Sequence, residues 1–187
     1  MTDPTEPIPD WVDALLHFWF AEVGEQGWWG HDPALDALCA DRWLALWEGK
    51  RREPAASFLA RADEAMAAII LFDQMPRNMF RDSARAFATD PLARAIAHGA
   101  VAQGFDIQIG GAGRAFFYMP FMHSEAMADQ TLSVRLFEGL GDARSLEFAR
   151  RHHDIIARHG RFPHRNAALG RESRPEERDA VEAGADW

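Results

Sequence analysis

Apolar side chains recur at intervals of three and four residues through most of the chain, and this helical spacing limits its possible folds more than any other feature. Trp11, Leu15, Phe18 and Trp19 show the spacing near the start. The one strand-like run, residues 107–109, is too short to make a sheet by itself. The pattern therefore predicts an all-α protein built from antiparallel helix hairpins.

Proline and glycine mark where these helices should begin and end, because proline suits the first turn of a helix and glycine the position after its end. We expect Thr89 or Asp90 to cap one helix and Ser124 to cap another. We expect Pro76 and Pro120 to end helical segments. The helices expected on these signals span residues 10–24, 33–49, 55–73, 91–104, 127–140 and 142–159, with a short one from residue 173. Loops are expected at residues 24–31 and 104–113.

The length and composition are those of a soluble globular domain, with 187 residues, 48% of them hydrophobic. We expect a single domain over residues 10–178, a flexible tail over residues 1–9 and a frayed tail over residues 179–187. The net charge of −9 argues against a nucleic-acid partner, which would need a basic surface, and weakly against an anionic membrane surface. A monomer and a homodimer both remain possible.

The lone cysteine, Cys39, cannot form an internal disulfide, which favours a reducing compartment. It lies in an apolar pattern and is expected to be a small buried side chain. The first residues lack the basic start and apolar core of a signal peptide. No apolar run approaches the length of a membrane span, so we expect a cytoplasmic protein with no membrane partner.

Three polar segments interrupt the pattern of core and surface residues, and each lies at a break between expected helices. If they converge, they bring acids, bases and cations to one place. The first segment contains Asp73, Arg77 and Asn78; the second contains His123, Glu125, Asp129 and Gln130; the third contains His164, Arg165 and Asn166. The single tyrosine, Tyr118, lies five residues before His123 and is expected near them.

These residue types permit three interpretations. In the first, Arg77 and Arg165 clamp the anionic group of a small ligand or peptide through their planar guanidinium forks. In the second, the protein is an enzyme, such as a hydrolase, in which His123 or His164 is the general base and Glu125 or Asp129 orients it. In the third, the segments form only an ion-pair network that holds helix hairpins together.

Metal and cofactor sites are not expected. The histidine and carboxylate spacing matches no strong metal-binding signature, and the glycine-rich stretch Gly110–Gly113 lacks the lysine that follows in a phosphate-binding loop.

Several motifs in a fixed order resemble one protein family. They are Phe18-Trp19-Phe20, residues 69–78 with Asp73-Gln74-Met75-Pro76-Arg77-Asn78, residues 85–90, Phe117-Tyr118-Met119-Pro120, His123-Ser124-Glu125, Asp129-Gln130, residues 160–166 and Leu169-Gly170-Arg171. Together they resemble the DUF924 family of bacterial and fungal proteins, over about residues 10–177. The resemblance implies an all-helical fold similar to tetratricopeptide-repeat proteins, and it implies no activity.

Overall fold

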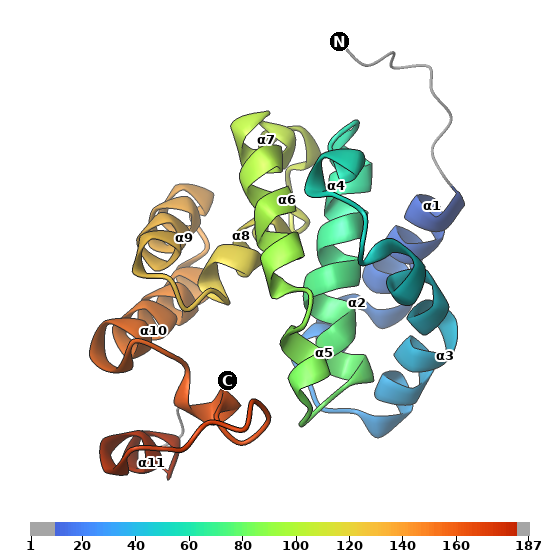
Figure 1. Ribbon diagram of the computed structural model, residues 1–187. Coiled ribbons are helices and arrows are strands. Elements are labelled where there is room, and N and C mark those ends of the chain that lie inside the picture. Colours follow the sequence, from blue (N-terminus) through green and yellow to red (C-terminus); the bar gives the residue numbers. More distant parts are fainter. Residues whose placement is uncertain (1–9, 183–187) are drawn as a thin grey trace. The chain divides into compact units, whose positions relative to one another are not determined.

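A computed structural model describes residues 10–182, and every regular element within that range is a helix (Figure 1). The predicted all-α class is confirmed. The tail predicted at residues 1–9 lies outside the described residues, as does most of the one predicted at 179–187. Residues 179–182 belong to the last helix, α11 (Pro175–Glu182). Within the described range, no helix combines the length and the hydropathy that a membrane crossing would require.

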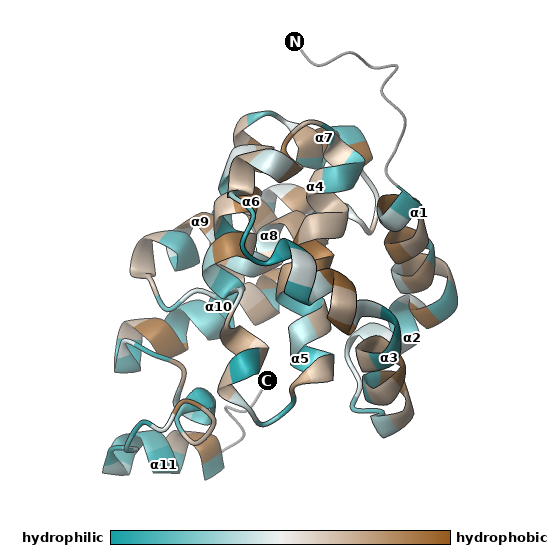
Figure 2. Ribbon diagram, turned by 45° about the vertical axis from the view of Figure 1, so that its right-hand side comes forward, coloured by the Kyte–Doolittle hydropathy of each residue, from teal (hydrophilic) through white to brown (hydrophobic). Residues whose placement is uncertain are grey.

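The chain forms two compact units. The first contains the described residues up to Arg81 and Arg85–Phe117, and the second contains Asp82–Ala84 and the described residues from Tyr118 onward. The predicted single domain and its tetratricopeptide-like arrangement stay predictions. Figure 2 shows that most helices of each unit carry both hydrophilic and hydrophobic residues along their length, as expected for helices with one face packed inward.

The first helix of the first unit ends at Gly24, as predicted. Helix α1 (Asp10–His17) runs into a π-helical segment, η1 (Phe18–Val23), whose C-cap is Gly24, with a φ of 62° and a ψ of −179°. The predicted loop from Gly24 is wrong over most of its length, because a short helix, α2 (Gly24–Trp28), follows directly. Trp28 then donates a hydrogen bond from Nε1 to Trp19 O at 2.8 Å.

Aromatic rings cover this end of the first unit. Trp28 meets Phe116 edge to face with centroids 5.0 Å apart, and Trp29 stacks over Phe116 at 6.4 Å. Trp28 is partly buried, whereas Trp29 is 55% exposed. The two tryptophans therefore pack over core aromatic residues of this unit.

Helix α3 (Pro33–Lys50) follows the predicted bounds closely. The Asp32 side chain accepts a hydrogen bond from Ala34 N at 2.8 Å, which caps the helix as its sequence indicates. Cys39, Trp43 and Trp47 face the core. Burial, followed by the charge of Asp36, raises the pKa of Cys39 to about 12, so this thiol stays protonated, as expected of a packing residue.

The next segment corrects the prediction that Pro76 stops a helix. A short 3-10 turn, η2 (Ala55–Phe58), precedes α4 (Ala62–Ile69), which continues through a π segment, η3 (Ile70–Gln74), into α5 (Met75–Met79). Proline has no N–H to offer the Phe72 carbonyl four residues before it. The Thr89 hydroxyl supplies that hydrogen bond instead, at 2.7 Å. Pro76 lies in the first turn of α5, where proline is tolerated, and the Thr89 hydroxyl bonds a carbonyl that the proline cannot serve.

After the 3-10 turn η4 (Ala84–Phe87), helix α6 (Asp90–Ala102) lies beside α4 (Figure 1). Thr89 occupies its N-cap position but makes no capping hydrogen bond, since its hydroxyl bonds to Phe72. The loop expected at 104–113 contains a short helix, α7 (Phe105–Ile109). Helix α8 (Arg114–Met122) crosses from the first unit to the second and contains Pro120, which was wrongly predicted to break it.

The second unit is built on a helix hairpin. Helices α9 (Met127–Leu140) and α10 (Ala143–His159) lie side by side (Figure 1), with bounds close to those predicted. Gly141 and the capping residue Asp142 form the turn between them, and Gly160 ends α10 with a φ of 73°. Ser124 is not the N-cap of α9, which is Ala126. A 3-10 turn, η5 (Pro163–Arg165), and α11 complete the unit.

Candidate functional site

The first predicted segment forms a paired network inside the first unit. Arg77 binds Asp90 with both ends of its guanidinium, at 2.9 Å and 3.1 Å. It also donates to Asp73 O and lies 3.4 Å from Asp73 Oδ1. Both carboxylates raise the pKa of Arg77 against the opposing effect of burial. Asp90, which the sequence suggested only as a helix cap, is thus the principal partner of Arg77.

The other polar groups of this segment bond to their own helix. Asp73 is fully buried and accepts a hydrogen bond from Gln74 Nε2 at 2.5 Å. Asn78 Nδ2 donates to Gln74 O at 3.3 Å, where the π segment meets α5. The predicted convergence of this segment with the other two, and its role in ligand binding, stay predictions.

The second and third segments meet within the second unit, through Glu125. Its carboxylate accepts a hydrogen bond from Phe162 N at 2.8 Å and two from Arg171, at 2.8 Å and 3.0 Å. Burial raises the pKa of Glu125, but these hydrogen bonds outweigh burial and hold the pKa below its ordinary value. Their spacing of four would place Glu125 and Asp129 on one face of a helix, but α9 begins only at Met127, after Glu125.

Asp129 and Gln130 stabilise the connection between α8 and α9. The Ser124 hydroxyl donates to Asp129 Oδ2 at 2.7 Å and accepts from Ala126 N at 3.1 Å. Gln130 is fully buried, and its Nε2 donates to the carbonyls of Met122 and Ser124, at 2.7 Å and 2.6 Å. These two side chains therefore bond to polar groups between α8 and α9, where backbone groups at helix ends have no partner within their own helix.

Two histidines, His152 and His164, and Arg165 surround the ring of Phe162, and with the neighbouring His123 we name them the histidine cluster. The ring of Phe162 lies 5.4 Å from that of His152 and 5.6 Å from that of His164, and the Arg165 guanidinium lies 4.4 Å from its centroid. His123 reaches the group through His152, with ring centroids 6.3 Å apart. The cluster joins the loop before α9, helix α10 and the turn η5.

The neighbours of His152 in the histidine cluster oppose its protonation. His152 is 5% exposed, and its Nδ1 lies 2.8 Å from Phe148 O. Burial lowers the pKa of His152 to about 3, and the charges of His123, Arg165 and His164 contribute to that lowering. His123 and His164 are themselves partly exposed, so solvent reaches two of the three imidazoles.

Glu177 organises a second network beside the histidine cluster. Its fully buried carboxylate accepts two hydrogen bonds from Arg161, at 2.7 Å and 2.8 Å, and one from Arg174 N at 2.8 Å. Asn166 Nδ2 donates to the same carboxylate at 3.2 Å. The hydrogen bond from Arg161 is the main reason that the pKa of Glu177 falls to about 2. Asn166, predicted to bind a ligand, thus bonds to a buried carboxylate of α11.

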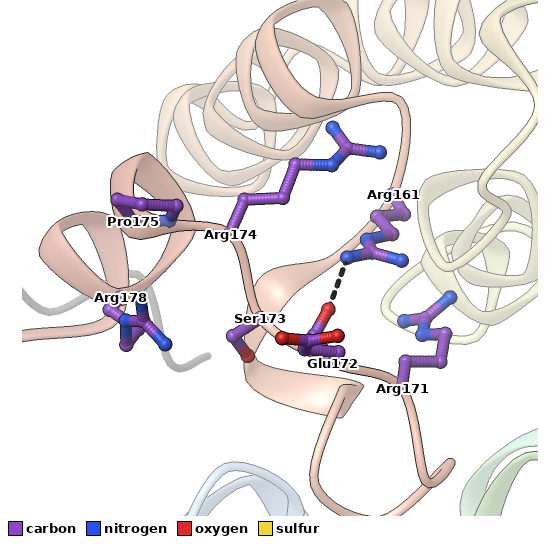
Figure 3. Close-up of a pocket in the computed structure, with 7 residues that line it drawn as sticks. All are labelled: Arg161, Arg171, Glu172, Ser173, Arg174, Pro175 and Arg178. Carbon is purple, nitrogen blue, oxygen red and sulfur yellow. Dashed lines mark hydrogen bonds between the residues drawn. The ribbon is translucent and has the colours of Figure 1, made fainter.

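An open hollow of about 730 Å³ lies beside this network, and we name it the arginine hollow (Figure 3). Figure 3 shows Arg161 and Arg171 on one side of Glu172 and Arg178 on the far side of Ser173. Arg161 also donates to Glu172 O at 2.8 Å. The residues that line the hollow are Arg161, Arg171, Glu172, Ser173, Arg174, Pro175 and Arg178.

Two further predictions concern Tyr118 and metal ions. Tyr118 is fully buried and packs edge to face on Phe137 at 5.6 Å, in the core of the second unit. Among residues 10–182, no three histidine, cysteine, aspartate or glutamate side chains are grouped closely enough to hold a metal ion.

Arg161 begins the third polar segment of the sequence, but neither it nor Arg171 nor Glu177 was predicted to be a site residue. Arg171 lies 46 residues from Glu125, and Arg161 lies 16 from Glu177, so no local spacing connects either pair. The sequence offered only a weak indication: Arg161 lies in the same motif as Arg165, residues 160–166, and Arg171 lies in the motif Leu169-Gly170-Arg171.

Comparison with known proteins gives one family and one solved relative. Residues 15–185 match the model of a family described as bacterial protein of unknown function (DUF924). A solved protein of unknown function from Agrobacterium tumefaciens is 39% identical, with a TM-score of 0.87, over 92% of this chain and 97% of that one. A search of curated proteins found no match. The motifs, the helical fold and the family match over nearly all of the chain agree, and the protein belongs to the DUF924 family.

Proposed function

We propose that this protein binds a small anionic molecule, and that the histidine cluster of the second unit contacts the anionic group. The observation that carries the proposal is the grouping of two imidazoles and one guanidinium around Phe162, with the His123 ring beside that of His152. His164 and Arg165 come from one turn, and the sequence predicted both as site residues. Arg165 supplies a planar fork of donors, and His164 a partly exposed ring.

The electrostatics of the cluster support an anion in preference to a neutral ligand. The positive neighbours that lower the pKa of His152 act together on any group placed among them. An anion near His123 and His164 would gain from that field, and the apolar ring of Phe162 would limit competing water. The chain as a whole is acidic, so this local positive field is a property of these few residues.

The enzyme hypothesis has less support from the same geometry. A general base needs a partner that orients it, and Glu125 was the first candidate for that role. Both oxygens of Glu125 are taken by Arg171 and by Phe162 N. Asp129 accepts the Ser124 hydroxyl at 2.7 Å, in a contact that joins two helices. Binding is therefore the function that the cluster supports best.

The test is a titration with inorganic phosphate and with acetate, followed by NMR of the histidine rings. We expect the ring signals of His123 and His164 to move with either anion. Replacing His164 with glutamine removes an imidazole that we place against the anion and should weaken binding about tenfold or more, since a hydrogen bond to a charged group contributes about 1.5 kcal/mol or more.

The matched control is His153→Gln, because His153 belongs to the same unit but its ring pairs with Asp154 at 3.2 Å. This variant should bind as the unchanged protein does. Equal affinities in the His164 and His153 variants, or an absence of movement in the His123 and His164 signals, would contradict the proposal.

A further inference from the structure

We propose that the arginine hollow is a second binding site, separate from the histidine cluster, and that it takes a phosphate group, either free or as a phosphate ester of a small molecule. The hollow is lined by four arginines and one glutamate, in a chain whose net charge is −9. Arginine binds phosphate well because its planar fork matches two phosphate oxygens.

Two of the four arginines form the fixed wall of the site. Arg161 is held by Glu177 and Arg171 by Glu125, each through a pair of hydrogen bonds. Both carboxylates are partly or fully buried, so neither guanidinium needs to be ordered when a ligand arrives. Preorganised donors of this kind lower the entropic cost of binding.

The other two arginines supply the accessible charge. The Arg174 side chain is 53% exposed, and its nearest carboxylate oxygen, on Glu177, is 3.7 Å away. Arg178 is exposed one helical turn further along α11. Arg174 precedes α11 and Arg178 lies in its first turn, and Figure 3 shows their side chains extending in different directions.

An unused donor gives an independent indication of a ligand. Among the described residues, the Nε of Arg171 is buried and has no hydrogen-bond acceptor. A buried donor without an acceptor is costly, and such groups in native proteins call for an explanation. Arg171 also lines the hollow, so a phosphate bound there would lie beside a guanidinium that still has an unused donor.

The shape of the site favours phosphate over carboxylate. The arginines and the Ser173 hydroxyl surround the hollow from different sides (Figure 3). A tetrahedral phosphate presents three oxygens in different directions, whereas a planar carboxylate presents two in one plane. The volume of about 730 Å³ lies within the range of small-molecule sites, so it has room for the rest of a small ester.

The experiment uses the full chain and NMR of the arginine Nε–H groups, titrated with inorganic phosphate, glycerol phosphate and acetate at constant ionic strength. We expect phosphate to move the Arg171 Nε–H signal and acetate to bind at least about tenfold more weakly, a difference of roughly 1.4 kcal/mol. The titration with glycerol phosphate distinguishes the two forms of the ligand. Tighter binding of glycerol phosphate than of inorganic phosphate indicates a phosphate ester, and equal or weaker binding indicates the free ion.

The double variant R174Q/R178Q should weaken phosphate binding at least about tenfold, because it removes both accessible guanidinium groups. Arg135→Gln is the matched control, since Arg135 is exposed on α9 in the same unit and does not line the hollow. Far-UV circular dichroism checks that both variants fold, and R178Q alone replaces the double variant if that one does not.

Three results would overturn the proposal: no phosphate-dependent movement of the Arg171 signal, equal binding of acetate and phosphate, or equal affinities in the arginine variants and Arg135→Gln. The readout is separate from that of the histidine cluster. Loss of phosphate binding in R174Q/R178Q with unchanged histidine ring titrations would support this site alone, whatever the outcome at the cluster.

Discussion

At the scale of single residues, the side chain of Glu177 holds together several segments of the second unit. It is fully buried, and it binds the Arg161 side chain, the Arg174 backbone and the Asn166 amide. Its bond to Arg174 N also closes the first turn of α11 in the manner of a capping box. A charge in this position is stable only because several donors surround it.

Replacing Glu177 with glutamine should lower the free energy of unfolding near neutral pH by about 2 to 3 kcal/mol, because it leaves the Arg161 charge without its partner. Urea unfolding measures this change. Glu176→Gln is the control: Glu176 is exposed on the same helix turn, and its change should stay within about 0.5 kcal/mol. A loss no larger than the control's would show that the network adds little.

The same pair of proteins gives a prediction about acid. The pKa of Glu177 falls from 4.5 to about 2 in the folded protein, so folding favours the ionised carboxylate. Its contribution to stability is complete above pH 4.5 and is lost as the pH falls toward 2. The difference in unfolding free energy between the unchanged protein and Glu177→Gln should therefore shrink across that window. A difference that stays constant there would contradict the assigned pKa.

At the scale of elements, a residue outside the helix through Pro76 joins that helix to its neighbours. Thr89 donates to Phe72 O at 2.7 Å and accepts from Trp47 Nε1 at 3.1 Å. One hydroxyl thus joins α3, η3 and the start of α6, and it serves the carbonyl that the proline leaves without a donor.

Thr89→Val should lower the free energy of unfolding by about 1 to 3 kcal/mol, because it leaves a buried carbonyl and a buried indole N–H without partners. The matched control is Thr131→Val, since that exposed hydroxyl bonds only within its own helix, to Met127 O at 3.0 Å. Chemical denaturation compares the two variants.

A double-mutant cycle with Pro76→Ala separates the two partners of the hydroxyl. Alanine restores an N–H at this position, so Thr89→Val should cost less in the Pro76→Ala background than alone. If Thr89→Val lowers the free energy of unfolding equally in both backgrounds, the whole loss comes from the hydrogen bond with Trp47.

At the scale of the whole molecule, several of the many arginines have a structural role that depends on the guanidinium group. Of the 20 basic residues all but one are arginine, and in Arg77, Arg161 and Arg171 the guanidinium fork binds both oxygens of one carboxylate. Lysine cannot reproduce that geometry. The acidic net charge therefore coexists with local positive fields in the second unit.

The stability of the protein should depend on pH through His152. Its pKa is lowered from 6.5 to about 3, so the folded state holds it neutral. The resulting stability is complete above pH 6.5 and declines below it, by up to about 1.4 kcal/mol per pH unit, until the pH reaches about 3. Urea unfolding at several pH values measures the slope. His152→Gln should flatten it, whereas His17→Gln, at an exposed position of α1, should leave it unchanged.

Sequence alone was sufficient for features that depend on neighbours a few residues apart. Helical spacing determined the all-α class, the Asp32-Pro33 cap determined the start of α3, and Gly160 determined the end of α10. Capping and periodicity act within one or two turns, so they can be read directly from the chain.

Tertiary structure alone decided which distant groups pair. Thr89, 17 residues from Phe72, bonds the carbonyl that Pro76 cannot serve. Arg171 binds Glu125 across 46 residues, which made Glu125 a partner of a guanidinium and not of Asp129. The fold determines these partners. A buried charge or carbonyl needs a hydrogen-bonding partner, and that partner is the polar group that packing places next to it, however distant in sequence.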